Sequence, residues 1–396
     1  KRNFEAFLNI LYSGKLTVDK LVTHRFKFDD ATSAYSDETL NKAVGVLLSY
    51  ETSNDLTNHK IQYSSSKQSI SISSNILNVG FVGGGNYASR VLIPKLKKLD
   101  VNLNTLVANG GVKSSIAAKK NGFNYLSNQI DDVMLNKDID TIFIATQHDS
   151  HAKLVLRALE SKKNIFVEKP LALSMHELEQ IKAAHEHFSS KNGPINLVVG
   201  FNRRFAPMVE SAKELLSTED AFKTINININ AGHVPKNSWI NNLEKGGGRL
   251  LGECCHFIDL AKFLANSSIS SVNLIGPLKL DLIERNQNAV ITITFSNSSY
   301  AAINYFSNGH LSYPKENIQV SSGGKMIEIN NFLKFKSFGC KSKFQLPKFI
   351  QNKGQNNLLS SFVKSSISGV PLMDFKDIYE VSKFSIELAD LAKYRQ

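Results

Sequence analysis

A glycine-rich loop at positions 83–88 is the first part of the sequence whose residue types suggest chemistry. It reads Gly83, Gly84, Gly85, Asn86, Tyr87 and Ala88. In this G-x-G-x-x-A order the first glycine permits a tight turn, the second lets the backbone approach a pyrophosphate, and the small last residue lets a helix pack closely on a strand. The pyrophosphate would lie at the N-terminus of that helix, among free N–H groups. The loop predicts dinucleotide binding; a glycine-rich turn without a ligand is the alternative.

A second cofactor contact is expected where the strand predicted over residues 103–108 ends. Dinucleotide-binding folds usually carry an acidic residue there, which binds the adenosine ribose hydroxyls. This sequence has Asn109 instead, which can bond a hydroxyl and does not repel a 2′-phosphate. Lys113 and Ser114 follow and could hold that phosphate. The predicted cofactor is NAD or NADP, with NADP permitted; Lys113 as an ordinary surface lysine is the alternative.

Lys169 is the main candidate for proton transfer. It lies in Glu168-Lys169-Pro170, directly after the strand predicted over residues 164–167, where ligands bind in doubly wound sheets. Oxidation of a hydroxyl by a nicotinamide needs a group that accepts the hydroxyl proton, and reduction needs that group to donate it. Burial beside a positive nicotinamide would lower the lysine pKa. Glu168 is expected to orient cofactor or backbone, and Pro170 tolerates a cis bond; a surface lysine before a turn is the alternative.

His256 is the second candidate for proton transfer. It lies near the start of the helix predicted over residues 253–264. A neutral imidazole can relay a proton between substrate and solvent, and a hydrogen-bonded core histidine is the alternative. Asp259, three residues later, could orient His256 or form a packing bond.

Other candidates follow neighbouring strands. Three residues after the strand predicted over 141–145 are expected to border the nicotinamide ribose: Thr146, Gln147 and His148. Arg203 or Arg204 could pair with a substrate phosphate or carboxylate, with a structural salt bridge as the alternative. Trp239 could cover the face of a sugar, although a lone tryptophan is more often a core residue.

Repeated βα units must position the first group of these residues. From residue 76 to about residue 200, apolar runs of strand length alternate with stretches of helical spacing. Such alternation predicts a doubly wound parallel sheet of the Rossmann type. Strands are expected over 76–82, 103–108, 141–145, 164–167 and 196–200, and helices over 87–99, 114–121, 151–161 and 175–188.

The pattern changes after residue 200. Residues 224–231 read TINININA, a period-2 alternation typical of a half-buried antiparallel strand. Further strands are expected over 289–295, 300–305 and 317–321, with helices over 253–264 and 375–392. The predicted fold class is α/β: a Rossmann domain over residues 76–200, followed over residues 201–396 by an α+β substrate-binding domain with an open, mainly antiparallel sheet and a C-terminal helix.

Residues 1–75 differ from both regions. A helix over 4–12 and a strand over 44–48 indicate a small α/β piece, and residues 52–75 have the Ser-, Asn- and Gln-rich composition of a linker or an edge strand. We therefore place domain boundaries after residues 51 and 75. The chain begins Lys-Arg-Asn-Phe, without a methionine or an apolar signal core, and we expect it to be a fragment of a longer protein.

The composition excludes several classes of protein. Of 396 residues, 42% are hydrophobic and 21% charged, as in soluble globular proteins, and no apolar run is long enough to predict a membrane span. The net charge of +12 favours anionic partners, but no motif indicates nucleic acid. The densest run of lysines, over residues 334–353, indicates a solvated face or a phosphate-binding rim. Three cysteines suit a reducing, cytoplasmic compartment, and no Cys or His spacing indicates a metal site.

Four segments together resemble a known family. They are the glycine loop, Ala145-Thr146-Gln147-His148, Glu168-Lys169-Pro170, and Gly246-Gly247-Gly248 through His256. These segments are similar to the Gfo/Idh/MocA oxidoreductases, the glucose–fructose oxidoreductase and inositol dehydrogenase type, over about residues 76–392. The resemblance implies a Rossmann domain followed by an open-sheet α/β domain, a catalytic Lys169, and a homo-oligomeric NAD(P)-dependent oxidoreductase.

The sequence departs from this family at one position. Many relatives place an aspartate four residues before the histidine, which forms a Lys–Asp–His set, but here the residue is Gly252 and the acid is Glu253. On a helix a one-residue shift turns a side chain by about 100°. Glu253 either reaches the site from a changed backbone, as a catalytic residue with Lys169 and His256, or has no catalytic role.

Residues 1–50 resemble a different family. Residues 12–16 (YSGKL) and 21–26 (LVTHRF), with Ala34-Tyr35, look like the C-terminal end of a medium-chain dehydrogenase/reductase. The pairing is similar to bacterial two-module oxidoreductases, in which such a dehydrogenase precedes a Gfo/Idh/MocA module, often in surface-polysaccharide biosynthesis. The resemblance implies that a covalently joined dehydrogenase module precedes this chain.

Three functions remain open. The leading hypothesis is an NAD(P)-dependent oxidoreductase that transfers a hydride between nicotinamide and a secondary hydroxyl or keto group of a sugar or nucleotide sugar. A second is a glycoside hydrolase that oxidises its substrate transiently and recycles bound NAD; net consumption of cofactor separates the two. The third is a non-catalytic nucleotide-binding module, which Lys169 and His256 argue against and Gly252 slightly favours.

Overall fold

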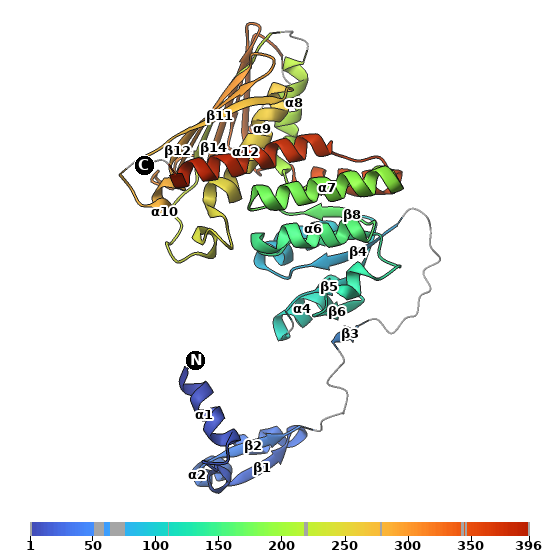
Figure 1. The fold of residues 1–396 in the computed structure, drawn as a ribbon, viewed down its shortest axis with the longest axis vertical. Coiled ribbons are helices and arrows are strands. Elements are labelled where there is room, and N and C mark those ends of the chain that lie inside the picture. The colour runs from blue at the N-terminus through green and yellow to red at the C-terminus, as the bar shows by residue number, and fades with distance from the viewer. Residues whose placement is uncertain are drawn as a thin grey trace. The chain divides into compact units, whose positions relative to one another are not determined.

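The computed structural model describes residues 2–50, 59–63, 76–109, 111–217, 221–277, 279–341, 344 and 347–394. The chain forms two compact units, Lys1–His59 and Lys60–Gln396 (Figure 1). Most of the predicted linker over residues 52–75 lies outside the described residues, but Lys60–Gln62 form strand β3 of the second unit. None of the helices in the described ranges is both long and apolar enough to cross a membrane.

The first unit is a small α/β piece with almost no apolar core. Its main elements are α1 (Arg2–Tyr12), β1 (His24–Lys27), α2 (Asp37–Lys42) and β2 (Val46–Ser49). Strands β1 and β2 pair in parallel. Among its described residues only Ala34 and Thr39 are buried, and thirteen large apolar side chains are exposed. Burial of apolar surface therefore contributes little to the stability of this unit on its own.

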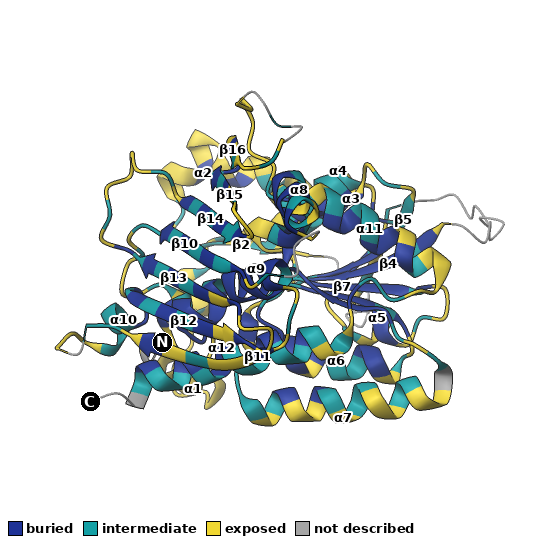
Figure 2. Ribbon diagram, turned by 90° about the horizontal axis from the view of Figure 1, so that it is seen from above, coloured by how far each residue is buried: buried dark blue, intermediate teal, exposed yellow. Residues whose placement is uncertain are grey.

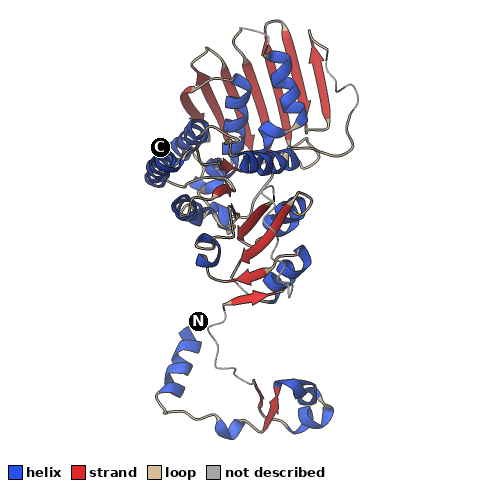
Figure 3. Cartoon of the chain, turned by 90° about the vertical axis from the view of Figure 1, so that its right-hand side faces the viewer, coloured by secondary structure: helices blue, strands red, loops and turns tan. Residues whose placement is uncertain are grey.

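The second unit contains two sheets, whose strands are red in Figure 3. The first is a seven-stranded sheet in the order β3-β6-β5-β4-β7-β8-β9. Neighbouring strands are parallel except for the edge pair β3–β6. The strand order reverses at β4, so this is the predicted doubly wound Rossmann sheet. The strands are β3 (Lys60–Gln62), β4 (Leu77–Val82), β5 (Val101–Val107), β6 (Tyr125–Ser127), β7 (Thr141–Ile144), β8 (Asn164–Val167) and β9 (Leu197–Val199).

Helices lie on both faces of this sheet, as Figure 2 shows for α6 and α7 on one side and α3 and α11 on the other. Their apolar sides cover the buried strands, which Figure 2 shows in dark blue. The helical segments after β4 are the π-helical η3 (Ala88–Leu92), α3 (Ile93–Leu96), α4 (Val112–Asn121), α5 (Asp131–Met134), α6 (His151–Glu160) and α7 (Met175–Asn192).

A second seven-stranded sheet follows in the order β11-β12-β13-β10-β14-β15-β16. Only β10 and β13 pair in parallel, so the prediction of an open, mainly antiparallel sheet is confirmed. The alternation TINININA buries every second residue of β10, as its period predicts. The strands are β10 (Thr224–Asn230), β11 (Ile269–Ile275), β12 (Ala289–Phe295), β13 (Tyr300–Phe306), β14 (Glu316–Ser322), β15 (Lys325–Asn330) and β16 (Lys334–Phe338).

Four later helices connect the two sheets. They are α8 (Pro207–Leu216), α9 (Cys255–Ala265), α11 (Gln355–Ser368) and α12 (Phe375–Tyr394). Helix α11 falls in the region predicted to belong to the second domain, yet its Phe362 packs edge-on against Phe143 and Phe166 of the first sheet. Helix α11 thus packs on the first sheet, although it follows the predicted boundary at residue 200 in the sequence.

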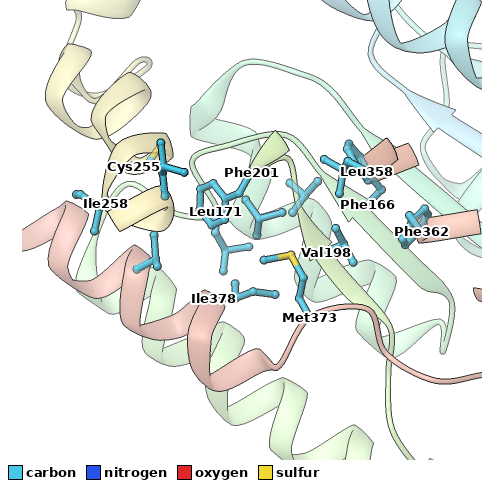
Figure 4. Close-up of a cluster of buried hydrophobic side chains, with 14 of the residues drawn as sticks. Phe166, Leu171, Val198, Phe201, Cys255, Ile258, Leu358, Phe362, Met373 and Ile378 are labelled. Atoms are coloured by element: carbon cyan, nitrogen blue, oxygen red, sulfur yellow. The ribbon is translucent and has the colours of Figure 1, made fainter. Parts of the chain in front are cut away.

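One apolar cluster holds the first sheet against the helices of the second region (Figure 4). Phe166 of β8 and Val198 of β9 lie in it with Ile258 of α9, Phe362 of α11 and Ile378 of α12. Each such buried side chain contributes about 1.5–3 kcal/mol of transfer free energy. The cluster fixes the ends of β8 and β9 relative to α9, and these ends carry the candidate functional residues.

Candidate active site

The glycine loop leads from β4 directly into a helix. Gly83 has φ +111°, and a Cβ atom there would lie 2.4 Å from the carbonyl oxygen of Ala145, so the position requires glycine. A Cβ atom at Gly85 would meet nothing within 4 Å, and Ala88 is buried where the helix packs. Asn86 and Tyr87 are exposed between them. This loop has the turn, the open backbone and the close helix packing that a dinucleotide pyrophosphate requires, so it fits NAD or NADP.

The residues predicted to contact the adenosine ribose lie at the end of β5 and the start of α4. Asn109 and Lys113 are exposed, and Ser114 is half-buried. The hydroxyl of the next residue, Ser115, lies 2.7 Å from the hydroxyl of Tyr63, which follows β3. Asn109 and Lys113 are therefore accessible to a ribose or to its 2′-phosphate.

Lys169 lies at the carboxyl end of β8, after a half-buried Glu168. Its Nζ donates a hydrogen bond to the carbonyl oxygen of Gly252, and its peptide bond to Pro170 is cis. The Lys169 ammonium is therefore held by a backbone oxygen of the segment that leads into α9.

His151, at the start of α6, supports this loop from behind. Its imidazole is fully buried, with Nδ1 2.8 Å from the carbonyl oxygen of Pro170 and Nε2 3.3 Å from that of Thr146. Burial lowers the pKa of His151, so the ring is neutral and donates its one N–H over the shorter distance, to Pro170. His151 links the segments that follow β7 and β8. Nothing in the sequence distinguishes His151 as a residue with this role.

Glu168 packs against the backbone of the neighbouring strand end. A Cβ atom at Gly200 would come within 2.9 Å of both its carboxyl oxygens, so Gly200 leaves room for this side chain. The carboxyl group accepts a hydrogen bond from the backbone N–H of Lys169. Burial raises the pKa of Glu168 to about 7, although the charges of Lys169 and Arg203 oppose the shift. Near neutral pH, Glu168 is therefore only partly ionised.

Glu253 lies in a π-helical turn, η7 (Leu250–Cys254), which precedes α9. Its carboxylate pairs with Arg249 at 3.1 Å and accepts a hydrogen bond of 2.6 Å from the hydroxyl of Tyr305 in β13. Burial acts to raise the pKa of Glu253, but the charges of Arg249 and then of Lys169 outweigh it and lower the pKa. Glu253 is thus an ionised acid that acts on Lys169 through its charge, and the hydrogen bond of Lys169 goes to Gly252.

His148 occupies the space that a side chain at position 252 would need. A Cβ atom at Gly252 would lie 2.9 Å from Cε1 of His148. The buried ring donates from Nδ1 to the carbonyl oxygen of Gly246 at 2.8 Å and meets the Trp239 indole edge-on, with 4.8 Å between ring centroids. Burial and the charge of Lys169 lower the pKa of His148 to about 3. Its Nε2 is therefore a hydrogen-bond acceptor in the electrostatic environment of Lys169. Trp239 lies beside the His148 ring, and 41% of the Trp239 surface is exposed. Thr146 and Gln147 are less buried than His148.

His256 lies in the first turn of α9. The imidazole is buried, and its Nδ1 has no hydrogen-bond partner within the described ranges. Burial, followed by the charges of Arg203, Lys169, Lys353 and Lys315, lowers the pKa of His256, so the ring is neutral. The charge of Lys169 thus acts on His256, so the two candidates for proton transfer share one electrostatic environment.

The adjacent arginines of η5 (Asn202–Phe205) have different environments. Arg204 is buried and binds Asp259 through two hydrogen bonds, the longer of 3.0 Å. The prediction that Arg204 binds substrate is therefore replaced by its alternative, a structural salt bridge, and Asp259 is engaged by Arg204 and does not orient His256. Arg203 faces the candidate site and binds Glu316 through Nη2 at 3.1 Å and Nε at 3.4 Å.

Two residues of this region carried no signal in the sequence. Glu316, the first residue of β14, is fully buried, and its Oε1 also accepts a hydrogen bond of 2.7 Å from Nζ of Lys353. Lys353 belongs to the lysine run over residues 334–353 and precedes α11. Only the fold could show that this one lysine reaches the site. No group of three His, Cys, Asp or Glu side chains in the described parts of the chain could hold a metal ion.

Two models of one protein family match the chain. Residues 77–191 match the model GFO_IDH_MocA, described as an oxidoreductase family with an NAD-binding Rossmann fold. Residues 221–324 match the C-terminal alpha/beta domain of the same oxidoreductase family. The two matches follow each other in the order of the two sheets.

Curated relatives share part of the chain. The uncharacterized oxidoreductase YrbE of Bacillus subtilis is 31% identical over 184 residues, which cover 45% of this chain and 52% of YrbE. The scyllo-inositol 2-dehydrogenase (NAD(+)) of the same organism is 32% identical over 36% of this chain and 40% of the relative. The matched stretch thus spans about half the length of these relatives, or less.

Solved structures share the fold. A levoglucosan dehydrogenase in complex with NADH superimposes with a TM-score of 0.67 at 20% identity, over 81% of this chain and 98% of the other. The aldose-aldose oxidoreductase from Caulobacter crescentus, complexed with glycerol, has the same TM-score and coverage at 18% identity.

Proposed function

We propose that this chain, which belongs over residues 77–191 and 221–324 to the Gfo/Idh/MocA oxidoreductase family, is an NAD(P)-dependent dehydrogenase or reductase of a sugar or nucleotide sugar. It would act on a secondary hydroxyl or keto group. The observation that carries the proposal is the position of Lys169 at the carboxyl end of β8, where its Nζ bonds to Gly252 and its charge acts on His148 and His256. The scyllo-inositol and levoglucosan dehydrogenases among its relatives support a polyol or sugar substrate.

The residues of the first sheet would hold the cofactor. The backbone of residues 83–88 would bind the pyrophosphate, and Asn109, Lys113 and Ser114 the adenosine ribose with or without a 2′-phosphate. Segment 146–148 and Glu168 would border the nicotinamide ribose. When bound, a nicotinamide cofactor supplies the acceptor or donor of the hydride.

Lys169 would move the proton of the substrate oxygen. Its Nζ accepts the hydroxyl proton when a sugar is oxidised and returns it when a ketone is reduced. The carbonyl of Gly252 holds the ammonium form, and the ionised Glu253 stabilises its charge from a distance. The neutral His256 would bind the substrate oxygen and relay the proton. In this chain a backbone carbonyl thus accepts the hydrogen bond of Lys169, whereas the family resemblance implies an aspartate beside the lysine.

Further parts of the proposal are each supported by a single kind of observation. We propose that the first unit is the end of a medium-chain dehydrogenase/reductase domain. Its two strands pair in parallel, and thirteen large apolar side chains across the described part of the unit are exposed, so that the rest of such a domain could cover them. A homo-oligomeric assembly and a role in surface-polysaccharide biosynthesis rest on the family resemblance. Three thiols that form no disulfide with one another support a reducing compartment such as the cytoplasm.

Turnover of soluble cofactor tests the proposal. Inositols, hexoses and nucleotide sugars are incubated separately with NAD and with NADP, and the absorbance of the reduced cofactor is followed. A dehydrogenase forms one reduced cofactor for each substrate oxidised. Hydrolysis of a glycoside without net reduction would indicate the cofactor-recycling alternative, and cofactor binding without either reaction would indicate a non-catalytic module.

A further inference from the structure

The candidate site carries more positive than negative charge. The side chains of Arg203, Lys169, Lys353 and Lys315 all act on the His256 imidazole. In the described part of the chain, Glu316 is the one carboxylate bonded to members of this group, and it is shared by Arg203 and Lys353. One carboxylate can balance only one of these two cations.

Of the remaining cations, Lys315 has no carboxylate partner in the described part of the chain. The charge of Glu253 acts on Lys169, but Glu253 is also paired with Arg249, so it does not balance both cations. Lys169 donates to the carbonyl oxygen of Gly252, which carries no net charge. Lys315 is exposed next to the buried Glu316, and no side-chain bond of Lys315 occurs within the described ranges. Glu168 is only partly ionised near neutral pH because burial raises its pKa to about 7. Protein groups therefore leave a surplus of positive charge beside His256.

The backbone fixes this cluster from several elements. Asn202 donates from its side chain to the carbonyl oxygen of Lys353 at 2.6 Å. A Cβ atom at Gly354, with φ +85°, would lie 2.3 Å from the carbonyl oxygen of Asn202, so the segment that carries Lys353 packs tightly on η5. The carbonyl oxygen of Lys315 accepts a hydrogen bond of 2.9 Å from the backbone N–H of Asn230 at the end of β10. The backbone positions of Lys353 and Lys315 are thus fixed by η5 and by the end of β10.

We propose that the substrate carries an anionic substituent, a carboxylate or a phosphate, that binds at Lys315 and Lys353 while its reacting carbon faces Lys169 and His256. This inference rests on the proposed function and narrows its substrate class. Lysine ammonium groups bind such oxygens as point charges. A fixed surplus of one sign also attracts the opposite charge from solution.

Steady-state kinetics with matched sugars test this inference. The probes are glucose, glucuronate, glucose 1-phosphate and UDP-glucose, each with NAD and NADP, and the same set with inositol and inositol phosphate. The expected kcat/KM is at least about tenfold higher for charged than for neutral probes, which corresponds to one charge-assisted hydrogen bond. Rising salt should reduce this ratio. The uronate and phosphate arms identify which anion is preferred.

Two lysine variants make the test specific. Lys315→Ala should reduce the ratio of charged to neutral kcat/KM by about tenfold, mainly through KM. Lys334→Ala, an exposed lysine on β16, is the matched control and should leave the ratio unchanged. An equal kcat/KM for neutral and charged probes, or an unchanged ratio in Lys315→Ala, overturns the inference while turnover itself upholds the proposed function.

A direct binding measurement separates the two proposals if no probe is turned over. Calorimetry then compares the binding of glucuronate and glucose 1-phosphate with that of glucose to the whole chain and to Lys315→Ala. Binding of an anion that Lys315→Ala weakens supports the anion site even though the proposed dehydrogenase activity fails. Binding of neither anion overturns the inference.

Discussion

The two sides of the candidate site are held by different kinds of interaction. On the side of the first sheet, Gly83 and Lys169 are placed by backbone geometry at strand ends, and His151 ties two of those ends together through carbonyl groups. On the side of the second region, Arg203 is placed by an ion pair with Glu316, 113 residues further along the chain, which Lys353 joins.

This difference predicts which property of the protein a substitution on each side of the site will change. Backbone geometry at consecutive strand ends tolerates little change, because a shift there moves the whole loop. Ion pairs between side chains can be altered by single substitutions while the sheet remains intact. We therefore expect changes on the first side to affect the reaction itself, and changes on the second side to affect stability and the choice of substrate.

Removal of the Glu316 charge should have the largest effect on stability. Glu316→Gln leaves Arg203 and Lys353 without their buried counter-charge, and loss of one partner of a buried ion pair costs about 3–5 kcal/mol. Urea unfolding monitored by circular dichroism gives the free energy of unfolding. The exposed Glu160→Gln is the control and should change it by less than about 0.5 kcal/mol. Equal stability of the two variants would show that the second side does not depend on this ion pair.

Glu168 on the first side should give a pH-dependent effect of intermediate size. Its pKa is about 7 in the native chain and about 4.5 when unfolded, so between these values the unfolded chain has lost a proton that the native chain keeps. The contribution of Glu168 to stability is therefore fully present at low pH and is lost as pH rises through about 7. From pH 5 to 8, Glu168→Gln should gain about 1–3 kcal/mol of stability relative to the original chain.

Urea unfolding of both proteins at several pH values checks this. Since the neutral histidines of the site titrate equally in the two proteins, the difference between the two curves isolates Glu168. Parallel curves would contradict the raised pKa.

The contact between His148 and Gly252 should give the smallest effect. Gly252→Ala places a methyl group against the His148 ring and should destabilise the chain by about 1–2 kcal/mol. His148→Ala removes the ring, so the added methyl should cost less in the double variant. A double-mutant cycle on free energies of unfolding measures this coupling. Additive effects would mean that the ring moves aside freely.

Short contiguous motifs made the first side predictable. The glycine loop and Glu168-Lys169-Pro170 each follow an apolar strand, so their place at the edge of the sheet follows from the strand pattern. The second side lacked such local signals. Arg203 and Arg204 are adjacent in η5, and nothing in the sequence shows that one faces the site and the other binds Asp259.

Helix α11 shows a second reason why prediction from the sequence is incomplete. Its sequence QNNLLSSFVKSSIS is rich in Ser and Asn, which are poor helix formers. The signal that could have revealed it is the spacing of Leu358, Leu359, Phe362 and Val363, all of which are buried. That spacing predicts a helix, but the choice of sheet on which it packs depends on Phe143 and Phe166, far away in the sequence.

The role of Lys169 is tested most directly by single-turnover measurement of hydride transfer in Lys169→Met, with cofactor binding measured on the same sample. Lys153→Met, an exposed lysine of α6, is the matched control. The account predicts that hydride transfer slows by about 10²–10⁴-fold while cofactor affinity stays within about threefold, because the glycine loop is untouched. Hydride transfer at the rate of the control would contradict the assignment of proton transfer to Lys169.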